Sequence, residues 1–193
     1  MSPASKRRET RRSGRGVALV EAAIVTPLLL GLIFGIIEFG FVFKDKLTVS
    51  NASRAGARAG SAAGSNASAD LQILRAVGAS SGLARVEKVV VYKAASSTDP
   101  VPAGCTSSPV GIAGVCNVYD NSDLTISDAA FGDIAYSKNT YWPASSRVTS
   151  VAAPTGPDFL GVWVQVRHNS AFSSIVPSRL LSDAVVMRLE PTR

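Results

Sequence analysis

The sequence is poor in the residues that most enzymes use for chemistry. Among 193 residues it has one histidine, His168, and two cysteines. One histidine cannot supply the clustered imidazole ligands of a zinc site, and no second cysteine pair accompanies the first. A nucleophile elbow, a P-loop and Rossmann glycines are also missing. These absences argue against an enzyme and against a metal or cofactor site, and we interpret His168 as a surface or structural residue.

Charged residues are scarce and unevenly placed. They make up 18% of the chain, and the formal net charge is +6. Most of this charge lies in the first 15 residues, where KRRETRRSGR holds six basic side chains and one glutamate. No aromatic or motif context accompanies these bases, so we do not expect nucleic-acid binding. Beside an apolar helix they instead predict a cytoplasmic N-terminus and contact with membrane lipid.

The feature that dominates the sequence is a long apolar run, GVALVEAAIVTPLLLGLIFGIIEFGFVF, at residues 16–43. Its only charged residues are Glu21 and Glu38. As a helix, residues 17–43 would extend ~40 Å, and a bilayer core needs only ~30 Å. The run is too long for the apolar core of an ordinary cleaved secretory signal. We therefore predict a membrane-spanning helix over residues 17–43.

Several positions inside this run suggest specific roles. Glu21 would cost a few kcal/mol in hydrocarbon, so it is either functional or close enough to the cytoplasmic interface to reach water. Pro27 removes one helical hydrogen bond and is expected to kink or loosen the helix. Gly31 and Gly35 form a G-x-x-x-G pair, a spacing that lets two apolar helices approach closely.

A helical pattern continues beyond the apolar run as an amphipathic stem. In LTVSNASRAGARAGSAAG, Arg54 and Arg58 fall on one side, and we expect the other side to face a sheet. The predicted inner face consists of Leu47, Ala52, Ala55, Ala59 and Ala63. Residues 64–66 are a plausible stop, and Ser68 or Asp70 can cap a second helix that ends near residue 80.

The remaining sequence predicts a small β-rich domain. Residues 86–92, 159–168 and 182–190 have the composition or alternation of strands. Cys105 and Cys116 lie in a Pro/Gly/Ser-rich loop outside the cytoplasm, which favours a disulfide between them, with free thiols as the alternative. Residues 120–158 contain scattered aspartates without EF-hand spacing, so we interpret them as a solvated variable loop. The expected fold class is α+β, a long membrane helix and stem packed on a small antiparallel sheet, as in pilins.

The N-terminal pattern resembles the type III signal of type IV pilins and pseudopilins, because a basic leader, Gly16, Glu21 and a long apolar helix follow one another. The stretch GVALVEAAIVTPLLLGLIFGIIEFG, the stem NASRAGARAG and the final strands GVWVQVRH and AVVMRLEP resemble the TadE-like pseudopilins of the tight-adherence (Flp) pilus system. This resemblance implies cleavage by a prepilin peptidase between Gly16 and Val17. It divides the chain into a leader (1–16), a transmembrane helix (17–43) and an extracytoplasmic domain with its stem (44–193).

The resemblance also implies a function, a place and partners. The chain is expected to be a minor pilin or pseudopilin in the bacterial inner membrane, and possible incorporation into a surface pilus is left open. Its expected partners are the prepilin peptidase and other Tad/Flp components. Two departures stand out: Ala22 follows Glu21 where the major Flp pilin has Tyr, and Val17 replaces the Phe that many type IV pilins carry at the new N-terminus. The TadG-type relatives share the signal but have a long added domain. The alternative function is an uncleaved, signal-anchored protein whose outer domain binds a ligand.

Overall fold

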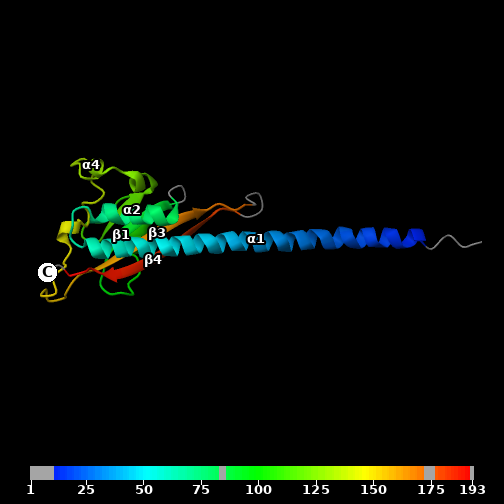
Figure 1. The fold of residues 1–193 in the computed structure, drawn as a ribbon, viewed down its shortest axis with the longest axis horizontal. Coiled ribbons are helices and arrows are strands. Elements are labelled where there is room, and N and C mark those ends of the chain that lie inside the picture. Colours follow the sequence, from blue (N-terminus) through cyan, green and yellow to red (C-terminus); the bar gives the residue numbers. More distant parts are fainter. Residues whose placement is uncertain (1–10, 83–85, 172–176, 192–193) are drawn as a thin grey trace, which may run out of the picture. The chain divides into compact units, whose positions relative to one another are not determined.

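The computed structural model describes residues 11–82, 86–171 and 177–191 (Figure 1). The chain divides into two compact units, one that ends at Phe41 and one that begins at Val42. The basic leader residues 1–10 lie outside the described residues. We describe each unit by itself.

Helix α1, Arg11–Ala63, is a single helix of 53 residues that passes through Pro27 without a break. It is the one described helix that is long and apolar enough to cross a membrane, with a mean hydropathy of 2.4 in its most apolar window. Every residue from Gly16 to Ile37 is exposed. Large aliphatic and aromatic side chains with no protein around them need an apolar solvent, which a bilayer provides. The predicted long N-terminal helix is confirmed, and its continuation as a stem is part of the same element.

The second unit contains a four-stranded antiparallel sheet with the order β2-β1-β3-β4. Its strands are β1 (Val86–Ala94), β2 (Cys116–Asp120), β3 (Phe159–His168) and β4 (Arg179–Arg188). The α+β class is therefore confirmed. The sequence misplaced β4, because pairing along the whole of β3 sets its bounds and aligns Arg179 with His168 and Arg188 with Phe159. It also missed β2, which is short and follows a Pro/Gly/Ser-rich segment.

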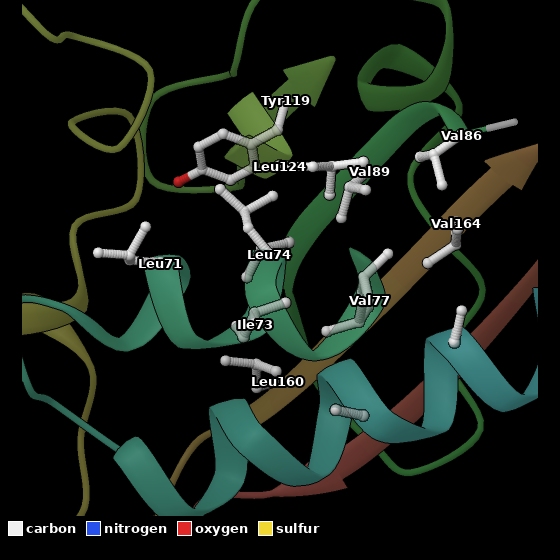
Figure 2. Close-up of a cluster of buried hydrophobic side chains, with 14 of the residues drawn as sticks. Leu71, Ile73, Leu74, Val77, Val86, Val89, Tyr119, Leu124, Leu160 and Val164 are labelled. Carbon is white, nitrogen blue, oxygen red and sulfur yellow. The ribbon is translucent and has the colours of Figure 1, made fainter. Parts of the chain in front are cut away.

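One face of the sheet carries the main hydrophobic core, to which both the stem and helix α2 (Ala69–Ser81) contribute. Figure 2 shows Ile73, Leu74 and Val77 of α2 within this cluster, together with Leu160 and Val164 of β3. A smaller cluster that includes Tyr92, Val118 and Trp163 covers the other face. The alternation predicted for β3 thus places valines on one face and Trp163 on the other.

The stem buries a different face from the one predicted. Ala52 is buried as expected, but Leu47 is 50% exposed. Ala55, Ala59 and Ala63 are only half-buried. The buried positions follow i, i+3, i+4 spacing and are Val49, Ala52, Ser53, Gly56, Ala57, Gly60 and Ser61. The predicted buried face was chosen by its alanines, and the glycines were not counted. The sheet packs instead against the side of the helix where the side chains are smallest.

The segment 121–158 is not simply a solvated loop. It forms the short helices η2 (Asn121–Thr125), α4 (Asp128–Phe131) and η3 (Ala144–Ser146). A further short helix, α3 (Ala103–Ser107), precedes β2. Leu124, Phe131 and Trp142 lie in the main core. Single apolar residues spaced among turn formers give no periodicity, so a pattern-based analysis could not detect this contribution.

Candidate functional site

The predicted processing signal lies on the exposed first half of α1. The Gly16–Val17 bond is inside the helix, which begins at Arg11, so secondary structure does not change at this bond. Val17 is 65% exposed, and Glu21, also exposed, follows it by about one helical turn. The structure therefore places Glu21 and the backbone nitrogen of Val17 on the same side of an uncovered helix.

The two small residues proposed for helix packing are also uncovered. A Cβ atom added at Gly31 or Gly35 would meet no heavy atom within 4 Å. Both glycines are one turn apart on the same face of α1. The described residues leave this face free for another helix, and whether one occupies it stays a prediction.

The stem packs closely against the rest of the domain at two other glycines, Gly56 and Gly60. We call this contact the seat of the stem. A Cβ atom at Gly56 would lie 2.8 Å from Cγ2 of Val77, and one at Gly60 would lie 2.7 Å from Cδ1 of Ile73 and 2.9 Å from Cδ2 of Leu160. Contacts this short do not occur at real Cβ atoms, so a larger residue at either position would force the neighbouring side chains to shift. Close packing here fixes the distance between α1, α2 and β3.

Polar contacts add to this seat near the beginning of the stem. His168, at the end of β3, is 2% exposed, and its Nδ1 lies 2.7 Å from Oδ2 of Asp45 on α1. Lys46 donates to Oδ1 of Asp183 at 3.1 Å, and Ser53 donates to Oδ2 of the same residue. The single histidine of the chain thus has a structural role, since it connects the stem to the sheet.

A buried polar network lies around Asp70, a residue that the sequence suggested as a helix cap. One carboxylate oxygen of Asp70 accepts from Nδ2 of Asn117 at 2.7 Å and from the hydroxyl of Tyr119 at 2.6 Å. The other oxygen accepts from Nη2 of Arg147 at 2.6 Å. Asn117 also exchanges hydrogen bonds with the backbone N–H and C=O of Trp142. Asp70 therefore connects α2 directly to β2 and to Arg147 at the end of η3. Through Asn117, the network also includes Trp142 in the segment before η3.

Burial makes this network electrostatically demanding. The Arg147 side chain is fully buried, and its guanidinium stacks over the Trp142 ring with 4.4 Å between them. Burial, and then the neighbouring Asp70 carboxylate, raise the pKa of Tyr119 well above its ordinary value, so the phenol stays a donor. Sequence analysis missed the network because its members are far apart in the chain. The available signal was a lone arginine in a segment otherwise poor in charge.

The predicted acidic loop forms a second polar cluster, at Asp120 and Asp123. Lys138 donates to both carboxylates, at 2.7 and 2.6 Å, and the hydroxyl of Tyr136 donates to Asp123 at 3.0 Å. Burial raises the pKa of Asp120, but hydrogen bonds from Lys138 and Ser122 outweigh it and lower that pKa to about 2. Among the described residues no group of His, Cys, Asp or Glu side chains is arranged to hold a metal ion. In this cluster, the positive charge that pairs with the two carboxylates comes from Lys138.

Cys105 of α3 and Cys116 of β2 form a disulfide, with their Cα atoms 6.4 Å apart. Both cysteines are buried in the smaller core, beside Val118 and Trp163. The bridge closes the segment that contains α3 and holds it against the outer side of β2. This is the pairing that the sequence favoured, with free thiols as the alternative.

A hollow of about 410 Å³ lies between the start of α2 and the segment around α4. Leu71, Phe131 and Tyr136 provide its apolar wall, and Asp128 and Asn139 are part of its polar wall. A shallow cavity of this size can receive a small ligand. Among the described residues, this hollow is one place where the alternative function named above could bind its ligand.

Comparison with known proteins identifies the N-terminal segment. Residues 16–58 match the family model of TadE-like proteins. The match lies wholly within α1 and covers the exposed apolar half and most of the stem. Neither the curated proteins nor the solved structures contain a significant match. Over residues 16–58, which cover the apolar half of α1 and most of the stem, this chain is therefore similar to TadE-like proteins.

Proposed function

We propose that the chain is a minor pilin or pseudopilin of a tight-adherence (Flp) pilus and secretion system. The observation that carries this proposal is α1 itself. One helix of 53 residues provides an uncovered apolar half and a stem that is packed on an antiparallel sheet, and the TadE-like match falls on this helix. Such an element lets a subunit stand in the membrane and later pack with other helices through the same apolar surface.

The proposed topology is a single span with the N-terminus in the cytoplasm and residues from 44 onward outside the bacterial inner membrane. The bases of the leader support this orientation. The disulfide supports it too, because oxidised cysteines persist outside the cytoplasm. Protease added to spheroplasts should digest the domain, and a protected domain would reverse the orientation. The proposed partners are a prepilin peptidase and other Tad pilus components.

Glu21 gives the proposal a mechanism. Cleavage after Gly16 would create an α-amine on Val17, mostly charged at neutral pH because its pKa is ~8. An isolated ammonium or carboxylate is costly in hydrocarbon, and the two together offset part of that cost. Glu21, one turn away, can pair with this amine or with the amine of a neighbouring subunit. Pairing between subunits would fix their axial register, because a shifted helix leaves both charges unpaired.

Three variants of the full chain test this proposal. Gly16→Leu should block cleavage through bulk at the scissile bond, whereas Gly40→Leu, at a position that is also uncovered, is the matched control and should be cleaved normally. Glu21→Gln should be cleaved but should lower pilus-dependent adherence, because the leader and Gly16 remain while the charge pair is lost. Cleavage is followed as a leader-sized shift on a gel and by N-terminal sequencing.

The outcomes separate the two functions. A mature chain that begins at Val17 supports the pseudopilin, and an uncleaved wild-type chain supports the signal-anchored alternative. Normal adherence with Glu21→Gln would show that the carboxylate only reaches the interface. Failure of Gly40→Leu to be cleaved would mean that any added bulk in α1 disturbs processing, and the Gly16 assignment would lose its support.

A further inference from the structure

Strand β4 forms one edge of the sheet, beyond β3 (Figure 1). Its odd-numbered residues direct their backbone groups toward β3, as indicated just past the strand by Leu189, whose N–H donates to the C=O of Asp158 at 2.9 Å. Successive residues of an antiparallel strand alternate in the direction of these groups. The even-numbered residues of β4 therefore direct their N–H and C=O groups away from the sheet.

Helix α1 satisfies some of these outward groups, at Ser182 in the first half of β4 and around its last residue, Arg188. Lys46 donates to the C=O of Ser182 at 2.7 Å. Ser61 donates to the C=O of Arg188 at 2.6 Å, and its own C=O accepts from the N–H of Glu190 at 3.0 Å. These contacts also show that α1 and β4 run in the same direction.

The middle of the edge is open. Between these ends, the outward N–H and C=O groups of Ala184 and Val186 have no partner in the part of the chain that the structure describes. We call residues 184–186 the β4 window. Ala184 is exposed, while Val185 and Met187, on the opposite face, are half-buried. A strand added here would find two sets of backbone groups and apolar side chains on both faces.

Natural proteins usually protect such an edge with charge, proline or a bulge. Strand β4 has no proline, and its register with β3 is uninterrupted. Its two nearest charged side chains have partners within the domain. Asp183 binds Lys46 and Ser53, and Arg188 stacks on Phe159 and donates to the C=O of Pro157. The charges that could repel another strand are thus engaged within the domain.

The opposite edge of the sheet is closed by comparison. Cys116 of β2 exchanges two backbone hydrogen bonds with Ile112, at 2.9 and 3.0 Å. The N–H of Asp120 donates to Asp123 at 2.8 Å. Between these positions only Val118 directs its backbone groups away from the sheet, which is too short a stretch to pair with a strand. The domain therefore offers one open edge and one closed edge.

We propose that the β4 window binds an extended strand from a different polypeptide, which adds to the sheet as a fifth strand. A partner of this kind must present alternating N–H and C=O groups and apolar side chains on both faces. Because the window is short, with both ends covered by α1, three or four residues of the partner make the central contact.

A second copy of this chain does not fit the window. Antiparallel pairing of two β4 strands would make the two stems run in opposite directions, because α1 runs with β4. Stems that leave the same side of one membrane must run in the same direction. A parallel β4 pair cannot be two-fold symmetric, since its slanted hydrogen bonds offset the strands. Pairing of β4 with β2 of another copy fails because β2 is closed.

Photo-crosslinking in native membranes tests the proposal on the full chain. A photoreactive residue is placed in turn at Ala184, at Val186 and, as a control, at Val110, an exposed apolar position near the closed edge. We expect adducts from the two β4 positions, both with the same second polypeptide. Mapped by mass spectrometry, the two partner sites should lie two residues apart in one apolar segment, which is the register of paired strands.

Two substitutions show whether backbone pairing holds the partner. With the crosslinker at Val186, Ala184→Pro removes an outward N–H and spares the ladder to β3. Ala184→Lys adds an edge charge, and Val110→Lys is its control. We expect at least a tenfold loss of adduct with both Ala184 variants and no loss with Val110→Lys. Retention of the Cys105–Cys116 disulfide and of trypsin resistance in each variant shows that the domain is folded.

Several results would overturn the proposal. These are adducts at twice the mass of the chain, partner sites scattered over several segments, equal adducts at Val110, or full yield with Ala184→Pro. The inference rests on the domain and does not require cleavage after Gly16. The same adducts are expected in the Gly16→Leu background, so failure here is distinguishable from failure of the pseudopilin assignment.

Discussion

At the scale of single residues, the most consequential side chain outside the membrane is Asp70. It is 2% exposed and accepts from Asn117, Tyr119 and Arg147, which come from β2 and from the end of η3. A buried ion pair contributes little net stability compared with an apolar pair, but breaking one leaves an uncompensated charge. Asp70 therefore matters chiefly because Arg147 cannot remain buried without it.

We predict that Asp70→Asn destabilises the domain by about 3–5 kcal/mol, because it leaves the Arg147 guanidinium buried without a counter-charge. Asp128→Asn is the matched control, since its ion pair with Arg75 is exposed and should contribute at most ~1 kcal/mol. Chemical unfolding of the full chain in detergent measures both. Equal stability of the two variants would contradict the assignment. Arg147→Met added to Asp70→Asn should recover part of the loss.

A second residue-scale prediction concerns acid. The pKa of Asp120 is about 2 in the folded chain and 3.8 ordinarily, so its ion pair stabilises the fold above about pH 3.8, and this contribution disappears as the pH falls through about 2. The difference in melting temperature between the wild type and Asp120→Asn should shrink from pH 5 to pH 2. In a Lys138→Gln background that pH-dependent difference should become smaller, and the part that remains comes from the hydrogen bonds of Ser122. A constant difference across this range would show that Lys138 does not hold the charge.

At the scale of elements, the seat of the stem explains both a success and an error of sequence analysis. The pattern predicted that small residues of the stem would let a sheet pack closely, and Gly56 and Gly60 do so. It placed the buried face wrongly because hydrophobicity ranks alanine and leucine above glycine. Closest approach depends instead on the absence of a Cβ atom.

This seat gives a prediction for α1. Gly60→Val should destabilise the domain by about 1–3 kcal/mol, because the added atoms would overlap Ile73 and Leu160. Ala62→Val, at an exposed position two residues along the same helix, should change stability by no more than ~0.5 kcal/mol. Thermal unfolding of both variants measures the difference. Tolerance of valine at both positions would mean that the helix can shift on the sheet at little cost.

The strands show the limits of pattern reading at this scale. Strand β3 was predicted with its correct bounds because its valines alternate along a half-buried sheet. Strand β2 was missed because disulfide bonding and pairing with β1, rather than local propensity, hold Cys116–Asp120 in the sheet. The short helices between β2 and β3 were not predicted for the same reason. Contacts distant in sequence determine their structure.

At the scale of the whole molecule, the sequence revealed the membrane helix, the stem and the α+β class, because these depend on composition and period. It could not reveal the polar network around Asp70 or the difference between the two edges of the sheet. Both depend on which residues meet after folding. The candidate site divides in the same way: Gly16 and Glu21 were proposed from their spacing and stay a prediction, whereas the β4 window required the register of the strands.

The continuity of α1 has a mechanical consequence. The stem is tied to the sheet at Asp45, at Lys46 and again at Ser61, and its two glycine seats lie between these positions. Within the second unit the stem is a continuous part of α1. A force applied to the stem along its axis therefore loads all of these contacts at once, in shear. The domain resists extraction as one unit instead of peeling away contact by contact.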